Sequence, residues 1–265
     1  MSDSQDRAFD VAAYVRSPIE LRPTDLDVSA TAGLRAGVLA VVEHLWTVER
    51  AILDLLRDLL LTPTHTESRV TAFLNTWAYE QYWLTQTLRA VLEANGDIDP
   101  DRPANRIGAV RRAWDERVRP TISAVRSNLV GEDIVAAQVT LGWLDTAVIH
   151  LGYQRLGELE PRLAELAAKV EPLKARHLAF YWTEARSRLD ASVGGRRLAR
   201  RAIARWRWPE VRYAGRTAVR PVVEMLYADR ATASRLRAID ADVARLPGLA
   251  DLTPVRRALG GFATS

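Results

Sequence analysis

The chain has no cysteine among its 265 residues. Disulfides, thiolate metal sites, iron–sulfur clusters and cysteine nucleophiles are therefore excluded together. Any metal would have to be held by carboxylate and imidazole groups. Gly/Ser/Pro-rich linkers are also lacking, so the sequence predicts one domain, although its length would allow two.

From the sequence we expect neither a leader segment nor a membrane-spanning helix. The first thirty residues hold no basic stretch followed by an apolar run, and no later stretch approaches the roughly 20 apolar residues of a membrane-spanning helix. We therefore expect a cytoplasmic protein without a membrane span. Hydrophobic residues make up 48% of the chain and charged residues 26%, which is typical of a globular fold.

No strand pattern, Gly-rich phosphate loop, nucleophile elbow or His-Glu-x-x-His motif occurs. Apolar residues instead recur at spacings of three and four, which predicts an all-α protein. Asn95-Gly96 is a typical left-handed end of a helix. The sequence predicts long helices over 29–60, 67–93, 132–159 and 161–189 (kinked at Pro172), a crossover connection over about 105–128, and shorter helices over 196–206, 220–227, 231–246 and 254–259.

Few polar residues fall on the apolar faces of the long helices. Glu49 is one, and a carboxylate there must be paired, protonated or bound to a cation, unless it lies at the helix edge and pairs with a neighbouring arginine. Further on, four aromatic residues surround Glu80 and Gln81, and Lys174 and His177 share one helix face. Taken singly, both segments fit an aromatic core with flanking surface charge.

Taken together, these segments resemble the ferritin-like di-iron carboxylate superfamily, and within it actinobacterial ferritin-like proteins similar to acyl carrier protein desaturases and ribonucleotide reductase small subunits. The resemblance covers most of the chain. It implies an N-terminal arm (1–28), a ferritin-like four-helix bundle with a crossover connection (29–191), and a basic C-terminal helical extension of the same domain (192–265). The family's six metal ligands, which are Glu residues and Glu-x-x-His pairs, correspond to Glu49, Gln81, Leu84, Thr146, Lys174 and His177.

Only Glu49 and His177 keep the ligand type that the family requires. Lost carboxylates imply a lost metal, because the charge of two irons would otherwise lie buried without balance. We expect Lys174 to replace the metal as the cation beside Glu49, in an ion pair shared with His177, and we expect no metal and no cofactor. The alternative is a single Fe or Zn bound by Glu49, His150 and His177.

Three functions follow from the degenerate metal site. In the first, the bundle cavity binds a small organic ligand or runs a metal-independent reaction, in secondary metabolism, with Glu49, Lys174 and His177 as acid–base groups. The second is a non-catalytic subunit paired with an active di-iron paralogue, and the third is a mononuclear iron oxygenase. The residues expected to line the cavity are Trp77, Gln81, Tyr82, Trp83, Leu84, Trp143, Thr146, His150, Tyr181 and Trp182.

Basic charge is concentrated in residues 196–220, where nine arginines face the single acid Glu210. A solvated surface helix is the plainest interpretation. The resemblance adds docking of an acidic carrier protein that bears the substrate. An anionic membrane surface comes third, and nucleic acid comes last because no recognition motif accompanies the charge. Either a homodimer or a heterodimer with a paralogue is compatible with the sequence.

Overall fold

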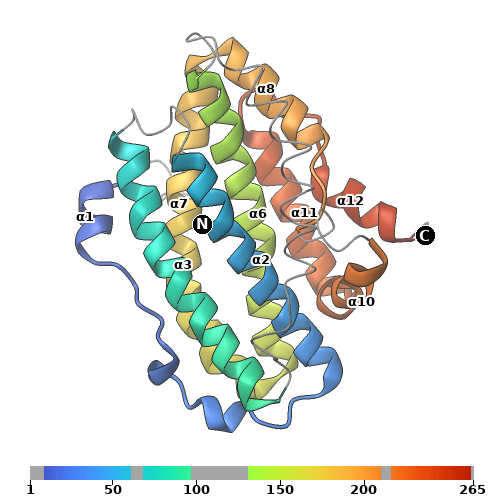
Figure 1. The fold of residues 1–265 in the computed structure, drawn as a ribbon. Helices are drawn as coiled ribbons and strands as arrows, with labels where there is room; N and C mark the ends of the chain where they lie inside the picture. The colour runs from blue at the N-terminus through green and yellow to red at the C-terminus, as the bar shows by residue number, and fades with distance from the viewer. Residues whose placement is uncertain (1–8, 61–67, 97–130, 210–215, 264–265) are drawn as a thin grey trace.

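The computed structural model describes residues 9–60, 68–96, 131–209 and 216–263 (Figure 1). In these residues all regular structure is helical and no strand occurs, which confirms the predicted all-α class. The predicted crossover over about 105–128 lies outside the described residues.

Four long helices lie side by side (Figure 1). These are α2 (Ala36–Leu60), α3 (Ser68–Ala94), α6 (Gly131–Leu159) and α7 (Ala164–Ala191). Helix α2 packs along α3 and α6 packs along α7, and the two pairs meet where α2 contacts α6 and α3 contacts α7. Each of the four predicted long helices is thus present, and α7 continues through Pro172.

The predicted start of the first long helix, near Ser29, is wrong. Residues Val28–Thr31 form a separate 3₁₀ turn, η2, and Gly33 follows with a φ of 72°, a left-handed conformation that interrupts a helix. Helix α2 therefore begins only at Ala36. The predicted left-handed end of the second helix is confirmed, since Gly96 has a φ of 69°.

Helix α6 lies at the centre of the molecule and contacts α2, α7, α8, α10 and α11. It approaches α7 closely, because a Cβ atom at Gly142 would lie 2.9 Å from the Tyr181 ring and one at Gly157 would lie 2.7 Å from the Ala167 Cβ. By length and composition Glu132–Leu159 could cross a membrane, contrary to the expectation from the sequence. Most of this stretch, however, is buried among the neighbouring helices, as is usual for a core helix.

The N-terminal arm crosses the outer side of α3. It contains α1 (Val11–Arg16), the 3₁₀ turn η1 (Pro23–Asp25) and η2, all of which contact α3. Tyr14 and Leu21 are buried, and the Thr87 hydroxyl donates a hydrogen bond of 2.7 Å to the Leu21 carbonyl. The arm is therefore part of the core.

The C-terminal extension covers the other side of α6. Its helices are α8 (Val193–Ala204), α10 (Arg216–Tyr227), α11 (Arg230–Arg245) and α12 (Pro254–Ala263). Helix α8 starts three residues earlier than predicted, because the Ser192 side chain accepts the Gly195 N–H at 3.0 Å and so caps a first turn that includes both glycines. One hydrophobic cluster runs from Val11 to Phe262, so the arm, long helices and extension share a core.

Candidate functional site

Each of the four long helices places one polar side chain at a common point in the interior. The Lys174 Nζ of α7 lies 2.6 Å from the Glu49 Oε1 of α2. The Gln81 side chain of α3 donates to the Glu49 Oε2 at 2.5 Å and accepts from Lys174 at 3.2 Å, while the Tyr153 hydroxyl of α6 donates to the Glu49 Oε1 at 3.2 Å. We call these four residues the Glu49–Lys174 cluster.

The Glu49–Lys174 cluster is sealed from solvent. Glu49 is 0% exposed and Lys174 is 2% exposed, and Gln81 and Tyr153 are also buried. Burial lowers the pKa of Lys174, and the opposing effect of Glu49 only partly offsets this. Burial and the Glu49 charge raise the pKa of Tyr153 well above its ordinary value, so the phenol keeps its proton and serves as a donor.

A second buried carboxylate, Glu80, lies one residue before Gln81. Its Oε2 accepts the Tyr14 hydroxyl at 2.5 Å and contacts the His177 Nε2 at 2.7 Å, while its Oε1 accepts the Ile19 N–H at 2.8 Å. Arg176 also forms an ion pair with Glu80, and it donates a 2.7 Å hydrogen bond to the Ser17 carbonyl of the arm. We call Glu80, Tyr14, His177 and Arg176 the Glu80 cluster.

Protons in the Glu80 cluster are held in fixed places. Burial alone would raise the pKa of Glu80, but the hydrogen bonds from His177, Ile19 and Tyr14 together hold this pKa below its ordinary value. Burial lowers the pKa of His177 to about 4. A neutral imidazole that bonds an ionised carboxylate must donate its Nε2–H, which leaves Nδ1 as an unprotonated nitrogen. This Nδ1 is buried and has no hydrogen-bond partner.

The two clusters together are balanced in formal charge. Glu49 and Glu80 provide two negative charges, and Lys174 and Arg176 provide two positive charges. The clusters are also coupled, because the charges of Lys174 and Glu49 act in opposite directions on the pKa of His177. A buried centre of this kind needs no further ion for neutrality.

The residues predicted from the sequence are only partly brought together. The expected ion pair between Glu49 and Lys174 is present, but His177 does not share it and instead bonds Glu80. Tyr82 was expected to line the cavity and is 47% exposed, because the residue after an inward-facing Gln81 is turned about 100° around the helix axis. The other residues expected at the cavity that are buried in the core are Trp77, Leu84, Trp143, Thr146, Tyr181 and Trp182.

The three residues of the predicted mononuclear metal set each bond another group. The His150 Nε2 lies 2.5 Å from Glu171 at the edge of the α6–α7 pair, where it also meets Gln154. Glu49 and His177 are engaged with Lys174 and Glu80 respectively. Among the described residues, no group of three or more potential ligands is arranged to hold a metal ion. The donor set also fits two irons poorly, since an amine, an amide, a hydroxyl and a leucine stand at four of the six positions that the resemblance assigns to metal ligands.

Sequence reasoning missed Tyr14, Glu80, Tyr153 and Arg176 as members of the centre. Glu80 was noticed only as a neighbour of Gln81. Tyr153 lies seven residues after Thr146, on the same helix face, and this spacing could have revealed it. Tyr14 has no such signal, because 66 residues separate it from Glu80.

Comparison with known proteins gives no match to a protein-family model, to a curated protein or to a solved structure. Function therefore has to be inferred from the residues of this chain.

Proposed function

We propose that this chain is a ferritin-like four-helix bundle, with a crossover connection and a C-terminal extension, that has lost di-iron chemistry and serves as a non-catalytic subunit. The ion pair of Glu49 with Lys174 is the main support for the loss of metal. The Lys174 ammonium lies 2.6 Å from the Glu49 carboxylate. Both residues correspond, by the resemblance, to metal ligands of a di-iron protein. The ammonium balances the carboxylate and repels a cation.

The central polar groups bond one another, which supports a non-catalytic role and argues against a ligand-binding cavity at this point. Glu49, Gln81, Tyr153 and Lys174 bond one another at 2.5 to 3.2 Å. A ligand would have to break these contacts and leave buried charges unpaired, which is costly. We therefore propose that the centre stabilises the fold, and that function lies on the surface in contact with an active di-iron paralogue.

Iron loading tests this proposal directly. The purified chain is incubated with ferrous iron under air, desalted and assayed by elemental analysis and by the near-ultraviolet absorption of oxo-bridged iron. We expect no bound iron above the level of a protein without a metal site. Two irons per chain would overturn the proposal, and one iron would favour the mononuclear oxygenase.

If the natural chain binds no iron, a matched variant shows whether the missing ligands are the reason. Gln81→Glu, Leu84→His, Thr146→Glu and Lys174→Glu together restore the family's ligand types. If this variant folds and binds iron while the natural chain does not, the correspondence with the six ligand positions holds. A folded variant that still binds no iron would count against the ferritin-like assignment.

The subunit role has a separate test. Where the genome that encodes this chain also encodes an intact di-iron paralogue, the two proteins are co-expressed and analysed by size-exclusion chromatography with light scattering. We expect a heteromeric complex with higher thermal stability than either protein alone. Two separate peaks at micromolar concentration would contradict a subunit role.

The Nδ1 of His177 favours a second candidate function, a metal-independent reaction. A buried, unprotonated nitrogen without a partner can accept a hydrogen bond from a small ligand. In this version Glu49, Lys174 and His177 are the acid–base groups, as the sequence predicts. Histidine ¹⁵N chemical shifts check it, because a ligand that reaches Nδ1 would move the resonance of this nitrogen, which is assigned by its absence from the spectrum of His177→Gln.

A further inference from the structure

Helix α8 presents a line of exposed arginines. Arg197, Arg201 and Arg205 are spaced four residues apart, at the helix and its C-cap, and all three are exposed. Four residues advance an α-helix by about 6 Å, so the line spans about 12 Å. Val193, which is 54% exposed, precedes it at the same spacing. We call Arg197, Arg201 and Arg205 the α8 arginine line.

Other arginines of α8 have structural partners, which sets the line apart. Arg200 forms a two-pronged ion pair with Asp251, at 2.5 Å for each contact, and Arg196 donates to the carbonyls of Leu189 and Asp190. Within the described part of the chain, no carboxylate pairs with a member of the α8 arginine line. Two arginines of this helix thus hold it in place, and three face outward.

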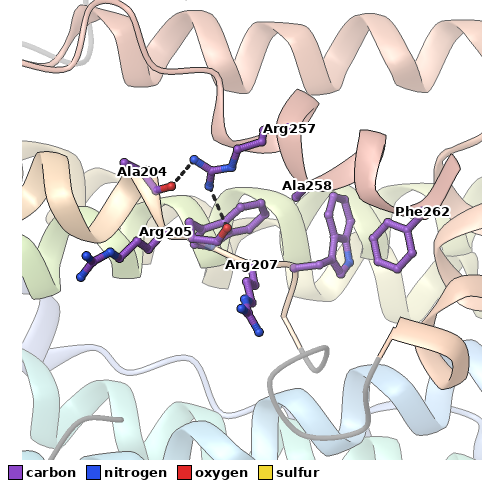
Figure 2. Close-up of a pocket in the computed structure, with 8 residues that line it drawn as sticks. Ala204, Arg205, Arg207, Arg257, Ala258 and Phe262 are labelled. Carbon is purple, nitrogen blue, oxygen red and sulfur yellow. Dashed lines mark hydrogen bonds between the residues drawn. The ribbon is translucent and has the colours of Figure 1, made fainter. Parts of the chain in front are cut away.

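The helix that carries the line is firmly seated. Its opposite face buries Ala199 and Ile203, and α8 packs along α6. At its C-terminal end the Arg257 guanidinium donates to the carbonyls of Ala204, Ile203 and Trp206, as Figure 2 shows in part. These bonds satisfy carbonyls that the helix end leaves free and place a positive charge where the helix dipole favours it.

A hollow lies beside the end of the line (Figure 2). Its volume is about 280 Å³, and it is bordered by Ala204, Arg205, Trp206, Arg207, Trp208, Arg257, Ala258 and Phe262. Arg207 is exposed at its rim, whereas the Trp206 indole is fixed by a 2.7 Å hydrogen bond to Asp145. A single side chain of a partner would fit such a hollow, next to three arginine side chains.

We propose that the α8 arginine line docks the acidic face of a partner protein, specifically a helix with carboxylates at four-residue spacing. Such a helix repeats charge every 6 Å or so, in step with the line. Arginine also suits carboxylates because its planar guanidinium can bond both oxygens. The inference depends only on this surface, so it stands or fails independently of iron binding.

Membranes and nucleic acids fit this surface less well. A membrane-bound amphipathic helix needs large apolar side chains beside its basic face, and among the described residues of α8 only Val193 is both large, apolar and exposed. Asp190 and Asp251 are exposed beside Arg196 and Arg200 of α8, so carboxylates interrupt the basic surface there. A long polyphosphate chain would meet these carboxylates, whereas a short acidic helix need not.

The test uses the full chain and a fluorescent helical peptide with glutamates at positions i, i+4 and i+8. A peptide of the same composition with the glutamates in adjacent positions serves as the reference. In fluorescence anisotropy at low salt, we expect the spaced peptide to bind at least about fivefold more tightly than the reference. Equal affinity for both peptides, or none for either, would overturn the proposal.

Variants locate the binding on α8. Arg197→Gln/Arg201→Gln/Arg205→Gln should weaken binding of the spaced peptide about tenfold, which corresponds to about 1.4 kcal/mol over three exposed pairs. The matched control Arg237→Gln/Arg245→Gln/Arg256→Gln removes the same charge from α11 and α12 and should change affinity less than twofold. Equal losses of affinity in both variants would show that binding depends on net charge and not on the α8 arginine line, and would overturn the proposal. If the chain binds phosphatidylserine vesicles or a single-stranded RNA more tightly than the spaced peptide, the partner is a membrane or a nucleic acid and the proposal is overturned.

Discussion

Lys174 is the residue on which the interpretation of the centre depends. It is buried beside Glu49, and burial lowers its pKa. An isolated charge in such a place would be destabilising, but a charge with a hydrogen-bonded partner can be tolerated. The two side chains therefore have to be considered together.

Replacing Lys174 with Ala should lower the free energy of unfolding by about 3 to 5 kcal/mol, because Glu49 would remain buried without its cation. The double variant Glu49→Gln/Lys174→Met, which removes both charges and keeps the volume, should recover most of this loss. Urea unfolding at pH 7 measures both. A loss below about 0.5 kcal/mol for the single variant would mean that the ion pair does not form.

His177 should make the stability of the protein depend on pH in the acidic range. The unfolded imidazole takes up a proton near pH 6.5, whereas the folded one does so only at about 4. Between these values unfolding takes up a proton, so stability falls as the pH falls, by about 1.4 kcal/mol per pH unit from this group.

Urea unfolding at several pH values, in the natural chain and in His177→Gln, measures this contribution. The variant retains an N–H for Glu80 and lacks the titrating ring, so its slope between pH 6.5 and 4 should be smaller. An unchanged slope in His177→Gln would contradict the proton placement.

Among the elements, the N-terminal arm has the least expected role. It supplies the Tyr14 hydroxyl and the Ile19 N–H to Glu80, and the carbonyl of Ser17 to Arg176. Stacking of Tyr14 on Phe73, with ring centroids 5.0 Å apart, adds an apolar contact. The arm therefore belongs to the structure of the centre.

Tyr14→Phe should lower the free energy of unfolding by about 1.5 to 3 kcal/mol, the range for a hydrogen bond to a charged group. Tyr79→Phe is the matched control, because the Tyr79 hydroxyl bonds Glu20 at an exposed site, and its effect should stay below about 0.5 kcal/mol. Chemical denaturation of the two variants side by side gives the comparison. Equal effects would show that the arm is not bound as described.

The long helices were predictable from the sequence, and the arm was not. Helical periodicity and turn residues such as Asn95 and Gly96 are local signals, so they predicted α3 within one residue at each end. The partner of Glu49 followed from charge balance. Contacts between Tyr14 and Glu80 join segments far apart in the chain, and no local pattern records them. The exposed position of Tyr82 was missed because an aromatic residue beside the centre was assumed to face it.

At the scale of the whole molecule, one hydrophobic cluster joins the arm, the long helices and the extension. A shared core predicts one cooperative unfolding transition. Tryptophans lie both in the long helices, as Trp77 and Trp143, and in the extension, as Trp206 and Trp208. Thermal or urea unfolding followed by tryptophan fluorescence and by far-ultraviolet circular dichroism should therefore coincide, and two separate transitions would show that the extension folds by itself.

The position of α7 along the chain also has a consequence during synthesis on the ribosome. Both cations of the centre, Lys174 and Arg176, are translated long after Glu49 and Glu80. Until they emerge, packing of α2 against α3 would bury Glu49 and Glu80 without a cation, which costs more free energy than leaving both carboxylates in water. We therefore expect α2 and α3 to stay apart at that stage. Ribosome-bound chains that end before residue 174 should be cut readily by protease within α3, and chains that extend past α7 should resist it. The protein thus cannot complete its interior until its last long helix has been made.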